Sequence, residues 1–447
     1  MRIIILGAGE VGTILAKSFV HEQHDVVIID KDPEKIASIT EQMDVQALVG
    51  HGSHPDVLEA AGASKCNMML AVTSSDEVNM VACQIAYSIF GIETKIARVR
   101  DEAYHRVTAD RLYNHDNMPI DVTISPGLEV ANMLTRTITL QGAFEVEDYL
   151  NGQFQLVGVH ARPGASCLGE KLSRFEQRYP TMRVAALYRG DRIIIPSPDD
   201  HIEKNDDVYL VSLRHQVPEL MEQLGYDGKQ NKDVFVVGGG HIGYNLCRNM
   251  EAMGFRPKVL ESDKSRAQWL ATHLGSTTVL HGDALDRTIL EQELITQMGA
   301  VVTVTSDDAS NILSSRLIAE MGGDNIITLI NESRFVPLVA SLGLEKIISP
   351  GEITSSRILK HLRVGQIHSI HALKDGRGEV LEANVTPESP LVGAHVTDLD
   401  LPRGVRLCAL FSHNKVVSIN EDTLIHAGDT VLLSVRENRI HVAERLL

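Results

Sequence analysis

The amino-acid sequence contains one glycine pattern twice, each time directly after a short apolar run and before a helical pattern. The first copy is Gly7-Ala8-Gly9-Glu10-Val11-Gly12, and the second is Gly238-Gly239-Gly240-His241-Ile242-Gly243. In each copy the next apolar run ends in an acid, Asp30 in the first and Glu261 in the second. The glycines and the acids are equally far apart, because 238 − 7 and 261 − 30 give the same difference. Two copies in the same order of strand, turn, helix, strand and acid indicate an internal duplication.

The residue types in this pattern suit a dinucleotide. The first glycine permits a tight turn, the second lets the backbone approach a pyrophosphate, and the third lets helix and strand pack closely. Free N–H groups and the positive end of the helix dipole then hold the phosphates. A carboxylate at the end of the second strand accepts both ribose hydroxyls of an adenosine and repels a 2′-phosphate, which favours NAD over NADP. The simpler alternative is that the glycines only fit a tight turn between strand and helix.

The duplication continues beyond the glycines. Strands alternate with helices at a spacing that predicts an α/β fold with two Rossmann-like, doubly wound parallel sheets and right-handed crossovers. The corresponding segments are residues 49–53 with 279–283, 71–79 with 302–311, 95–99 with 325–330, and 124–127 with 348–351.

A smaller module follows each Rossmann-like unit. Residues 145–213 and 368–434 are rich in Gly and Pro turns and contain short alternating strands, which we expect to surround one helix in each module. Residues 225–232 have the composition of a linker. We therefore predict Rossmann-like domains at residues 1–123 and 232–348, each followed by a small α+β domain, at 140–224 and 367–447.

The composition excludes several classes of function. The 447 residues include 42 Lys and Arg against 59 Asp and Glu, a formal net charge of −17. Such a surface repels phosphate backbones and anionic lipid headgroups, so we expect no direct binding to nucleic acid or bare membrane. The five cysteines are scattered and no acid or Cys cluster accompanies the 19 histidines, which predicts neither disulfides nor a metal site. No apolar run reaches the about 18 residues of a membrane span, and the direct start in a strand predicts no signal peptide.

Tandem Rossmann-like and small β-rich modules resemble the RCK (regulator of K⁺ conductance) domains. The resemblance covers essentially the whole chain and points to the TrkA family, the regulatory subunits of bacterial Trk potassium-uptake systems. Its most specific pieces are Gly50-His51-Gly52-Ser53-His54-Pro55, residues 71–84, and Ile96-Ala97-Arg98.

Several properties are implied by this resemblance alone. It implies NAD(H) as the cofactor, ATP or ADP as further ligands, and a homotetrameric ring of eight Rossmann-like units. It also implies an integral-membrane potassium-channel partner of the TrkH or TrkG type. The chain is then expected to be cytoplasmic and peripheral on the inner membrane through that partner.

The resemblance places the cofactor-binding residues around both glycine patterns. In the first half they are Gly7, Ala8, Gly9, Glu10, Val11, Gly12, Asp30, Thr73, Ser74 and Arg98. In the second half they are Gly238, Gly239, Gly240, His241, Ile242, Gly243, Glu261, Thr305 and Ser306. Alignment of the strands near 96–99 and 328–330 places Leu329 opposite Arg98, so the second site lacks this guanidinium. We therefore expect the first half to bind NAD(H) more tightly.

Two of these assignments have alternatives. The segment Thr73-Ser74-Ser75-Asp76 can line a cofactor cleft at the carboxyl end of a strand or cap the following helix, and one residue can do both. Arg98 can contact a phosphate or lie in solvent at the end of its strand.

The alternative function is an NAD-dependent oxidoreductase with an unidentified small substrate. Such an enzyme needs a substrate pocket and an acid or base beside the nicotinamide. Only about 70 to 80 residues follow each Rossmann-like unit, which is short for a substrate domain. The sequence contains neither a Tyr-x-x-x-Lys pair nor a Gly-x-Ser-x-Gly elbow. We therefore predict no catalytic residues, and a nucleotide-sensing regulatory subunit that controls potassium flux.

Overall fold

The computed structural model describes residues 1–447 except 22, 102, 107–108, 141, 191, 227–230, 345, 363–366, 374–376, 397–398, 400, 414 and 420–422. The chain folds into two compact units, Met1–Asn132 with Asn231–Leu359, and Met133–Gln230 with Lys360–Leu447. Helices α7 (Pro126–Thr139) and α15 (Pro350–Leu362) each begin in the first unit and end in the second. Residues 227–230 of the expected linker lie outside the described residues.

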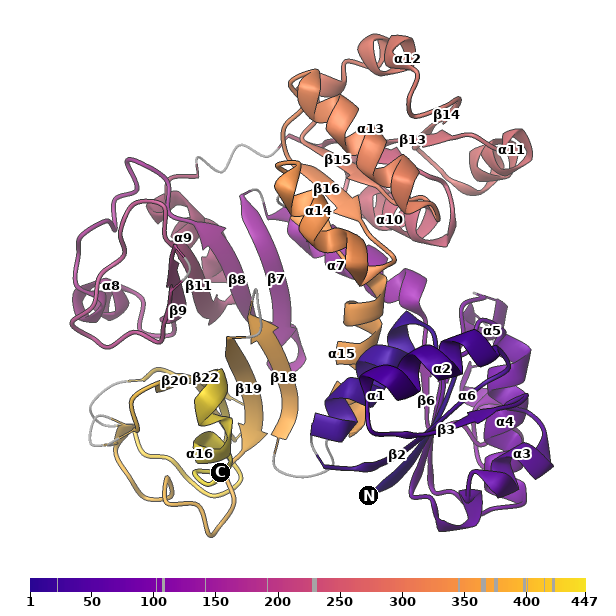
Figure 1. Cartoon of the computed structure of the whole chain (residues 1–447). Helices are drawn as coiled ribbons and strands as arrows, with labels where there is room; N and C mark the ends of the chain where they lie inside the picture. The colour runs from indigo at the N-terminus through magenta and orange to yellow at the C-terminus, as the bar shows by residue number, and fades with distance from the viewer. Residues whose placement is uncertain are drawn as a thin grey trace. The chain divides into compact units, whose positions relative to one another are not determined.

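The first unit contains two six-stranded parallel sheets, ordered β3-β2-β1-β4-β5-β6 and β14-β13-β12-β15-β16-β17 (Figure 1). The strands of the first sheet are β1 (Arg2–Leu6), β2 (Asp25–Asp30), β3 (Gln46–Val49), β4 (Met68–Ala71), β5 (Thr94–Arg98) and β6 (Val122–Ile124). Those of the second are β12 (Asp233–Val237), β13 (Arg256–Glu261), β14 (Thr278–His281), β15 (Ala300–Thr303), β16 (Ile326–Leu329) and β17 (Lys346–Ile348). This order is that of a doubly wound Rossmann sheet, so the predicted fold class is confirmed for both copies.

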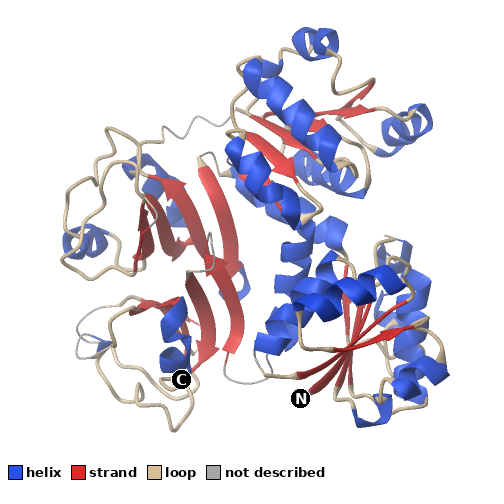
Figure 2. Ribbon diagram, viewed as in Figure 1, coloured by secondary structure: helices blue, strands red, loops and turns tan. Residues whose placement is uncertain are grey.

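Helices connect the strands and cover both faces of each sheet (Figure 2). In the first half they are α1 (Glu10–His21), α2 (Pro33–Gln42), α3 (Pro55–Ala60), α4 (Asp76–Ser88), α5 (Ala103–Arg106) and α6 (Ala109–Leu112), with the 3-10 turn η1 (Ala63–Lys65). In the second half they are α10 (His241–Ala252), α11 (Lys264–His273), α12 (Arg287–Gln292), α13 (Asp308–Glu320) and α14 (Val336–Ser341), with η4 (Ile295–Gln297) and η5 (Ser333–Phe335).

The apolar runs of the sequence form the central strands. Ile3, Ile4, Ile5 and Leu6 in β1 are fully buried, since helices cover both faces of the sheet. A strand buried on both faces carries a continuous apolar run instead of an alternating one. Leu6, at the end of β1, lies beside Ile29 of β2 and Ala71 of β4. The carboxyl ends of three strands therefore meet at one edge, where open α/β sheets bind ligands.

The second unit contains two five-stranded antiparallel sheets, ordered β10-β9-β11-β8-β7 and β18-β19-β22-β20-β21. The first is built from β7 (Ala143–Tyr149), β8 (Phe154–His160), β9 (Arg183–Arg189), β10 (Arg192–Ile194) and β11 (Asp207–Leu213), with η2 (Leu150–Gly152), η3 (Arg214–Gln216), α8 (Leu172–Arg178) and α9 (Val217–Gln223). The second is built from β18 (Ile367–Leu373), β19 (Gly378–Asn384), β20 (Val405–Ser412), β21 (Lys415–Val417) and β22 (Thr430–Arg436), with η7 (Glu437–Arg439) and α16 (Ile440–Glu444). The predicted α+β modules are confirmed. Among the described residues of 145–213 the one α-helix is α8, as expected, and α9 follows beyond that range.

The two antiparallel sheets share one core. The buried hydroxyls of Tyr149 and Tyr188 donate to the carbonyl oxygens of Val380 and Leu373, at 3.4 and 3.2 Å. Each tyrosine thereby satisfies its polar atom across the interface while its ring fills the core. The two small modules consequently form one folded body.

Candidate functional site

The first glycine pattern forms the turn between β1 and α1. Gly7 has a φ of +104°, which L side chains rarely adopt, and it lies against the backbone of Thr73. A Cβ added at Gly12 would lie 1.9 Å from the carbonyl oxygen of Gly7, so only glycine lets α1 approach β1 this closely. The fold itself therefore requires these two glycines.

Gly9 differs, because the fold places no demand on this residue. Its φ lies outside the left-handed region, and an added Cβ would have no neighbour within 4 Å. The space beside it is open at the first turn of α1, where backbone N–H groups lack partners within the helix. A phosphate that approaches these N–H groups benefits from a residue without a side chain.

Asp30 ends β2 and organises the same turn. Its Oδ2 accepts a hydrogen bond from the N–H of Ala8 at 2.7 Å, and its Oδ1 accepts one from the N–H of Asp32 at 2.9 Å. A carboxylate oxygen can accept more than one hydrogen bond. Asp30 can therefore accept hydroxyl donors while it holds the turn in place.

Asn79, fully buried in α4, connects the ends of β4 and β5. Its Oδ1 accepts from the N–H and the hydroxyl of Thr73, at 3.0 and 2.6 Å. Its Nδ2 donates to the carbonyl oxygens of Thr73 and Arg98, at 3.2 and 2.8 Å. The amide thus holds both strand ends in one arrangement. The sequence assigns Asn79 no role beyond its match with Asn311, although an Asn six residues after a Thr in both halves is a signal that identifies it.

Residues 73–76 serve both of the roles considered for them. Ser75 caps α4, because its Oγ accepts from the N–H of Val78 at 3.3 Å. Thr73 is instead held by Asn79, and the carbonyl oxygen of the exposed Ser74 accepts a hydrogen bond from the guanidinium of Arg100. Ser75 also lines the cavity described below, so one residue caps the helix and lines the site.

Arg98 ends β5 with a desolvated guanidinium. Its Nε is buried and has no hydrogen-bond partner among the residues that the structure describes. Burial, and to a smaller extent the charge of Arg100, lowers the pKa of Arg98 to about 10, while Asp76 acts in the opposite direction. Arg100, by contrast, pairs with Asp76 at 3.5 Å between Nε and Oδ1. A partly buried guanidinium whose Nε lacks a hydrogen-bond partner is unfavourable, and an anion beside it would offset that cost.

These residues line one cavity of about 170 Å³ at the carboxyl ends of the strands. It brings together six residues predicted from the sequence, Gly7, Gly9, Asp30, Thr73, Ser74 and Arg98. Ala8, Glu10, Val11 and Gly12 do not line it; Gly12 packs inside the turn, and the Glu10 carboxylate contacts Ser333. Ser75, which the sequence analysis considers for the cleft or for a helix cap, also lines it. The lining residues that were not predicted are Ile29, Lys31, Lys35, Gly50, His51, Gly52, Val72 and Val78.

The second glycine pattern repeats this backbone geometry. Gly238 has a φ of +102°, and a Cβ added at Gly243 would lie 1.9 Å from the carbonyl oxygen of Gly238. As at Gly9, a Cβ added at Gly240 would have no neighbour within 4 Å. The Oε2 of Glu261 accepts from the N–H of Gly239 at 2.8 Å. The structure therefore gives both halves the same turn and the same oriented acid.

The second half also repeats the buried amide. Asn311 accepts from the N–H and hydroxyl of Thr305, at 2.9 and 2.7 Å, and donates to the carbonyl oxygen of Leu329 at 3.0 Å. Leu329 therefore occupies the position of Arg98, as the alignment predicts, and it is 1% exposed. Ser306 is exposed in the following loop. An apolar, buried side chain thus replaces the desolvated guanidinium.

A different cation lies at the second turn. Arg266 of α11 donates from Nε to the carbonyl oxygen of Gly239 at 2.7 Å, and its guanidinium lies 4.1 Å from the ring centre of Trp269. The equivalent position in α2 is Lys35, which follows Asp30 at the same interval as Arg266 follows Glu261 and lines the first cavity. The two turns therefore differ in where their cationic side chains lie and in what these side chains contact.

One part of the sequence alignment is wrong. The N–H of Gly50 donates to the carbonyl oxygen of Asp30 at 2.9 Å, and the N–H of Gly282 donates to that of Glu261 at 3.0 Å. Gly282 is thus the counterpart of Gly50, and the pairing of residues 49–53 with 279–283 is displaced by two positions. The displacement is not evident from the sequence, because a His-Gly pair occurs in both segments, at His51-Gly52 and at His281-Gly282. The residue after Gly282 is an acid, whereas a histidine follows Gly50.

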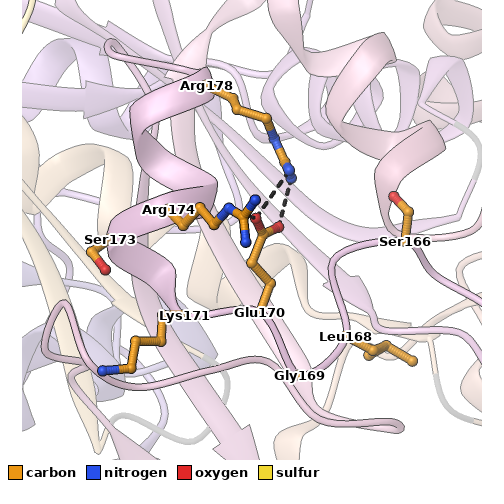
Figure 3. A pocket seen from close by; sticks show the side chains of 8 residues that line it. All are labelled: Ser166, Leu168, Gly169, Glu170, Lys171, Ser173, Arg174 and Arg178. Carbon is orange, nitrogen blue, oxygen red and sulfur yellow. Dashed lines mark hydrogen bonds and ion pairs between the residues drawn. The ribbon is translucent and has the colours of Figure 1, made fainter.

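A second hollow of about 610 Å³ lies beside α8 in the first small module (Figure 3). The guanidiniums of Arg174 and Arg178 both approach Glu170, with Arg178 making two hydrogen bonds of 3.0 and 2.7 Å. Lys171 pairs with Asp199 at 2.8 Å. Because carboxylates already engage these cations, the hollow offers an anion less than the first glycine turn does. No sequence motif predicted it.

The fold and its glycine turns define a class of protein in which a Rossmann-like unit and a small antiparallel module occur twice in tandem. The TrkA-N domain matches residues 3–126 and 234–350, and the TrkA-C domain matches residues 156–225 and 380–447. The chain is 37% identical to the Trk system potassium uptake protein TrkA of Azorhizobium caulinodans, covering 100% of this chain and 98% of that protein. It is 38% identical to the TrkA of Halomonas elongata with the same coverage. The chain therefore belongs to the TrkA family, as the sequence motifs predict.

Solved structures agree on the fold. The GsuK RCK domain covers 100% of this chain and 94% of its own, with a TM-score of 0.63 and 16% sequence identity. The GsuK channel bound to NAD covers 100% of this chain and 78% of its own, with a TM-score of 0.63 and 16% identity. The tandem RCK fold is thereby confirmed.

Proposed function

We propose that this chain is a nucleotide-sensing regulatory subunit that binds NAD(H) in its first half and controls potassium uptake through a membrane partner. The observation that carries the proposal is the first cavity, which combines the open backbone at Gly9, the oriented carboxylate of Asp30 and the desolvated guanidinium of Arg98. The relatives named above support the role in potassium uptake. The structures of the GsuK channel with NAD and with ADP, a protein of the same fold, support the choice of ligands.

The residues of the first cavity fit the parts of a dinucleotide. The N–H groups at the start of α1 would hold the pyrophosphate, and Arg98 would offset its charge. Asp30 would accept the ribose hydroxyls of the adenosine and would repel a 2′-phosphate. Thr73 and Ser74 line the remainder of the cavity. ADP or ATP presents the same adenosine and phosphate groups, so we infer that these ligands compete with NAD(H).

The second half is proposed as the weaker site. Its residues would be Gly238 to Ile242, Gly243, Glu261, Thr305 and Ser306, which keep the turn and the ribose acid. Leu329 supplies no charge where Arg98 stands in the first half. Arg266 is already engaged by a backbone carbonyl and an aromatic ring. We therefore infer that NAD(H) fills the first site before the second.

We infer a binding role and not a catalytic one. Relatives of this chain carry the name of a transport system. An oxidoreductase would consume the nucleotide, whereas a sensor releases it unchanged. Incubation of NADH with the protein and candidate small substrates, followed at the absorbance of NADH, separates the two functions.

Assembly into a tetrameric ring through the Rossmann-like units is part of the proposal. Val81 of α4 and Leu313 of α13 occupy equivalent positions, since each lies two places after the buried asparagine of its half, and they are 45% and 55% exposed. An exposed apolar side chain at the same position in both Rossmann-like units supports an equivalent subunit contact by each of them. The proposed modules are residues 1–123, 140–224, 232–348 and 367–447.

The proposed partner is an integral-membrane potassium-channel subunit of the TrkH or TrkG type. In the part of the chain that the structure describes, no helix is long and apolar enough to cross a membrane. With a net charge of −17, the chain is also poorly suited to anionic lipid. We therefore infer that it reaches the cytoplasmic face of the inner membrane by contacts with this partner.

Calorimetric titration of the full-length protein tests the proposal most directly. NADH, NAD⁺, ADP and ATP should each give a saturable isotherm, with NADPH as the control that Asp30 should exclude. If these nucleotides share the first cavity, each one that binds tightly should compete with the others for it. Absence of binding by all four nucleotides, or steady consumption of NADH, would contradict the proposed function.

A further inference from the structure

The first residues of α1 contact the second half of the first unit. The Oε1 of Glu10 accepts hydrogen bonds from the N–H of Ser333, at 3.3 Å, and from its hydroxyl. Gly351 in the first turn of α15 lies so close that an added Cβ would be 2.8 Å from the Cγ of Glu10. The buried hydroxyl of Ser355 donates to the carbonyl oxygen of Val11 at 3.4 Å. Three contacts therefore join the first glycine turn to residues 333–355.

The second glycine turn meets the first half in an equivalent way, but with a different side chain. A Cβ added at Gly127 in the first turn of α7 would lie 3.4 Å from the Cβ of His241. His241 holds the fourth place of the second glycine pattern, as Glu10 does in the first. The starts of α1 and α10 thus both lie at the seam between the two Rossmann-like units. Only the first presents a carboxylate there.

This carboxylate is unfavourable for a phosphate ligand. Glu10 is the first residue of α1, so its backbone N–H belongs to the group that would hold a pyrophosphate. Its side chain carries the same sign of charge as that ligand. Desolvation, and after it the charge of Glu10, raises the pKa of Glu352 in α15. The hydrogen bonds from Ser333 hold the Glu10 carboxylate at the seam.

We propose that Glu10 couples occupancy of the first nucleotide site to the contact between the two Rossmann-like units, an inference that rests on the proposed binding of NAD(H) there. A bound pyrophosphate repels the carboxylate of Glu10 when this side chain points toward the cavity. Binding therefore favours the orientation in which Ser333 donates to the carboxylate. Nucleotide binding thereby strengthens the seam. By linkage, the seam contact strengthens nucleotide binding by the same factor.

Two substitutions that alter this contact should change affinity in opposite directions. In the full-length protein, Glu10→Gln removes the repulsion and should lower the Kd for NADH about fivefold to tenfold, which corresponds to about 1–1.4 kcal/mol at 1.4 kcal/mol per tenfold. Ser333→Ala removes the partner, leaves the carboxylate free to approach the phosphates, and should raise the Kd by a similar factor. The matched control is Ser341→Ala in the same segment, whose hydroxyl donates to the carbonyl oxygen of Leu338 at 2.6 Å. Its Kd should equal that of the wild type.

Hydrogen exchange of residues 333–341 provides the second measurement. NADH should slow exchange of this segment in the wild type and in Ser341→Ala, and the effect should be lost in Glu10→Gln and Ser333→Ala. Kd shifts of the same sign in both variants indicate a merely structural contact and would overturn the coupling alone. Failure of the wild type to bind NADH would overturn the proposed function, and the coupling with it.

Discussion

Replacement of Arg98 by methionine should stabilise the ligand-free protein and weaken NADH binding. Burial, and to a smaller extent the charge of Arg100, lowers the pKa of this guanidinium to about 10, so the folded protein disfavours its charged form. Arg98 is only partly buried, so solvent screening reduces the net cost of the charge to about 1–2 kcal/mol. Methionine keeps most of the apolar stem and removes that cost. The free energy of unfolding should therefore rise by about 1 kcal/mol.

The same substitution removes the cation that would face the phosphates. A charge-assisted hydrogen bond contributes about 1.5–3 kcal/mol, so the Kd for NADH should rise about tenfold to 150-fold. Urea denaturation followed by circular dichroism measures the first effect, and calorimetric titration with NADH measures the second. Stability and affinity should thus move in opposite directions.

Arg100 is the matched control, two residues further along the chain. It pairs with Asp76, which is 7% exposed and also accepts from the backbone N–H groups of Arg100 and Asp101, at 2.8 and 2.9 Å. Arg100→Met leaves this carboxylate without its counterion and should lower the free energy of unfolding by about 1–2 kcal/mol. If Arg98→Met is instead destabilised by more than about 1 kcal/mol and binds NADH as the wild type does, the role assigned to Arg98 is wrong.

Further predictions concern the acids of the two turns and the assembly. Asp30→Ala should lose about 1.5–3 kcal/mol of NADH affinity, measured by calorimetry, and an unchanged Kd in a folded variant would refute the ribose role. Glu261→Ala should reduce NADH affinity less than Asp30→Ala; an equal or larger loss contradicts the ranking of the two halves. Light scattering should give a mass of four times 49.1 kDa, and the double variant Val81→Asp with Leu313→Asp should lower it; a wild-type monomer at micromolar concentration refutes the ring. Sedimentation with partner-free anionic liposomes should leave the protein in the supernatant, and strong co-sedimentation argues against recruitment by a protein partner.

The parts of the fold that could be predicted are those encoded by local patterns. The apolar run ending at Leu6 and the glycines that follow it specify a buried strand and a close turn to α1, because both depend on neighbours in the sequence. Asp30 could be placed for the same reason, since it ends the next strand. The presence of Leu329 at the position of Arg98 could also be predicted, because the two strands that end in these residues can be aligned with each other.

The remaining features depend on contacts between distant residues. Nothing in the local sequence shows that the amide of Asn79 reaches the carbonyl oxygen of Arg98, because Asn79 lies in α4 and Arg98 at the end of β5, 19 residues further along the chain. The displacement that makes Gly282 the counterpart of Gly50 appears only in the hydrogen bonds between strands. The contact of Glu10 with Ser333 spans 323 residues, and sequence periodicity carries no information over that separation.

Covalent linkage of the two Rossmann-like units has a consequence for the evolution of the seam between them. A pair assembled from two copies of one short gene product would have to carry the same residue at the start of both helices, and every mutation there would appear twice. In this chain an acid meets Gly351 on one side, while His241 meets Gly127 on the other. A single mutation in the gene therefore alters only one of the two Rossmann-like units. Gene fusion thus permits one nucleotide-binding turn to specialise while its duplicate preserves the architecture.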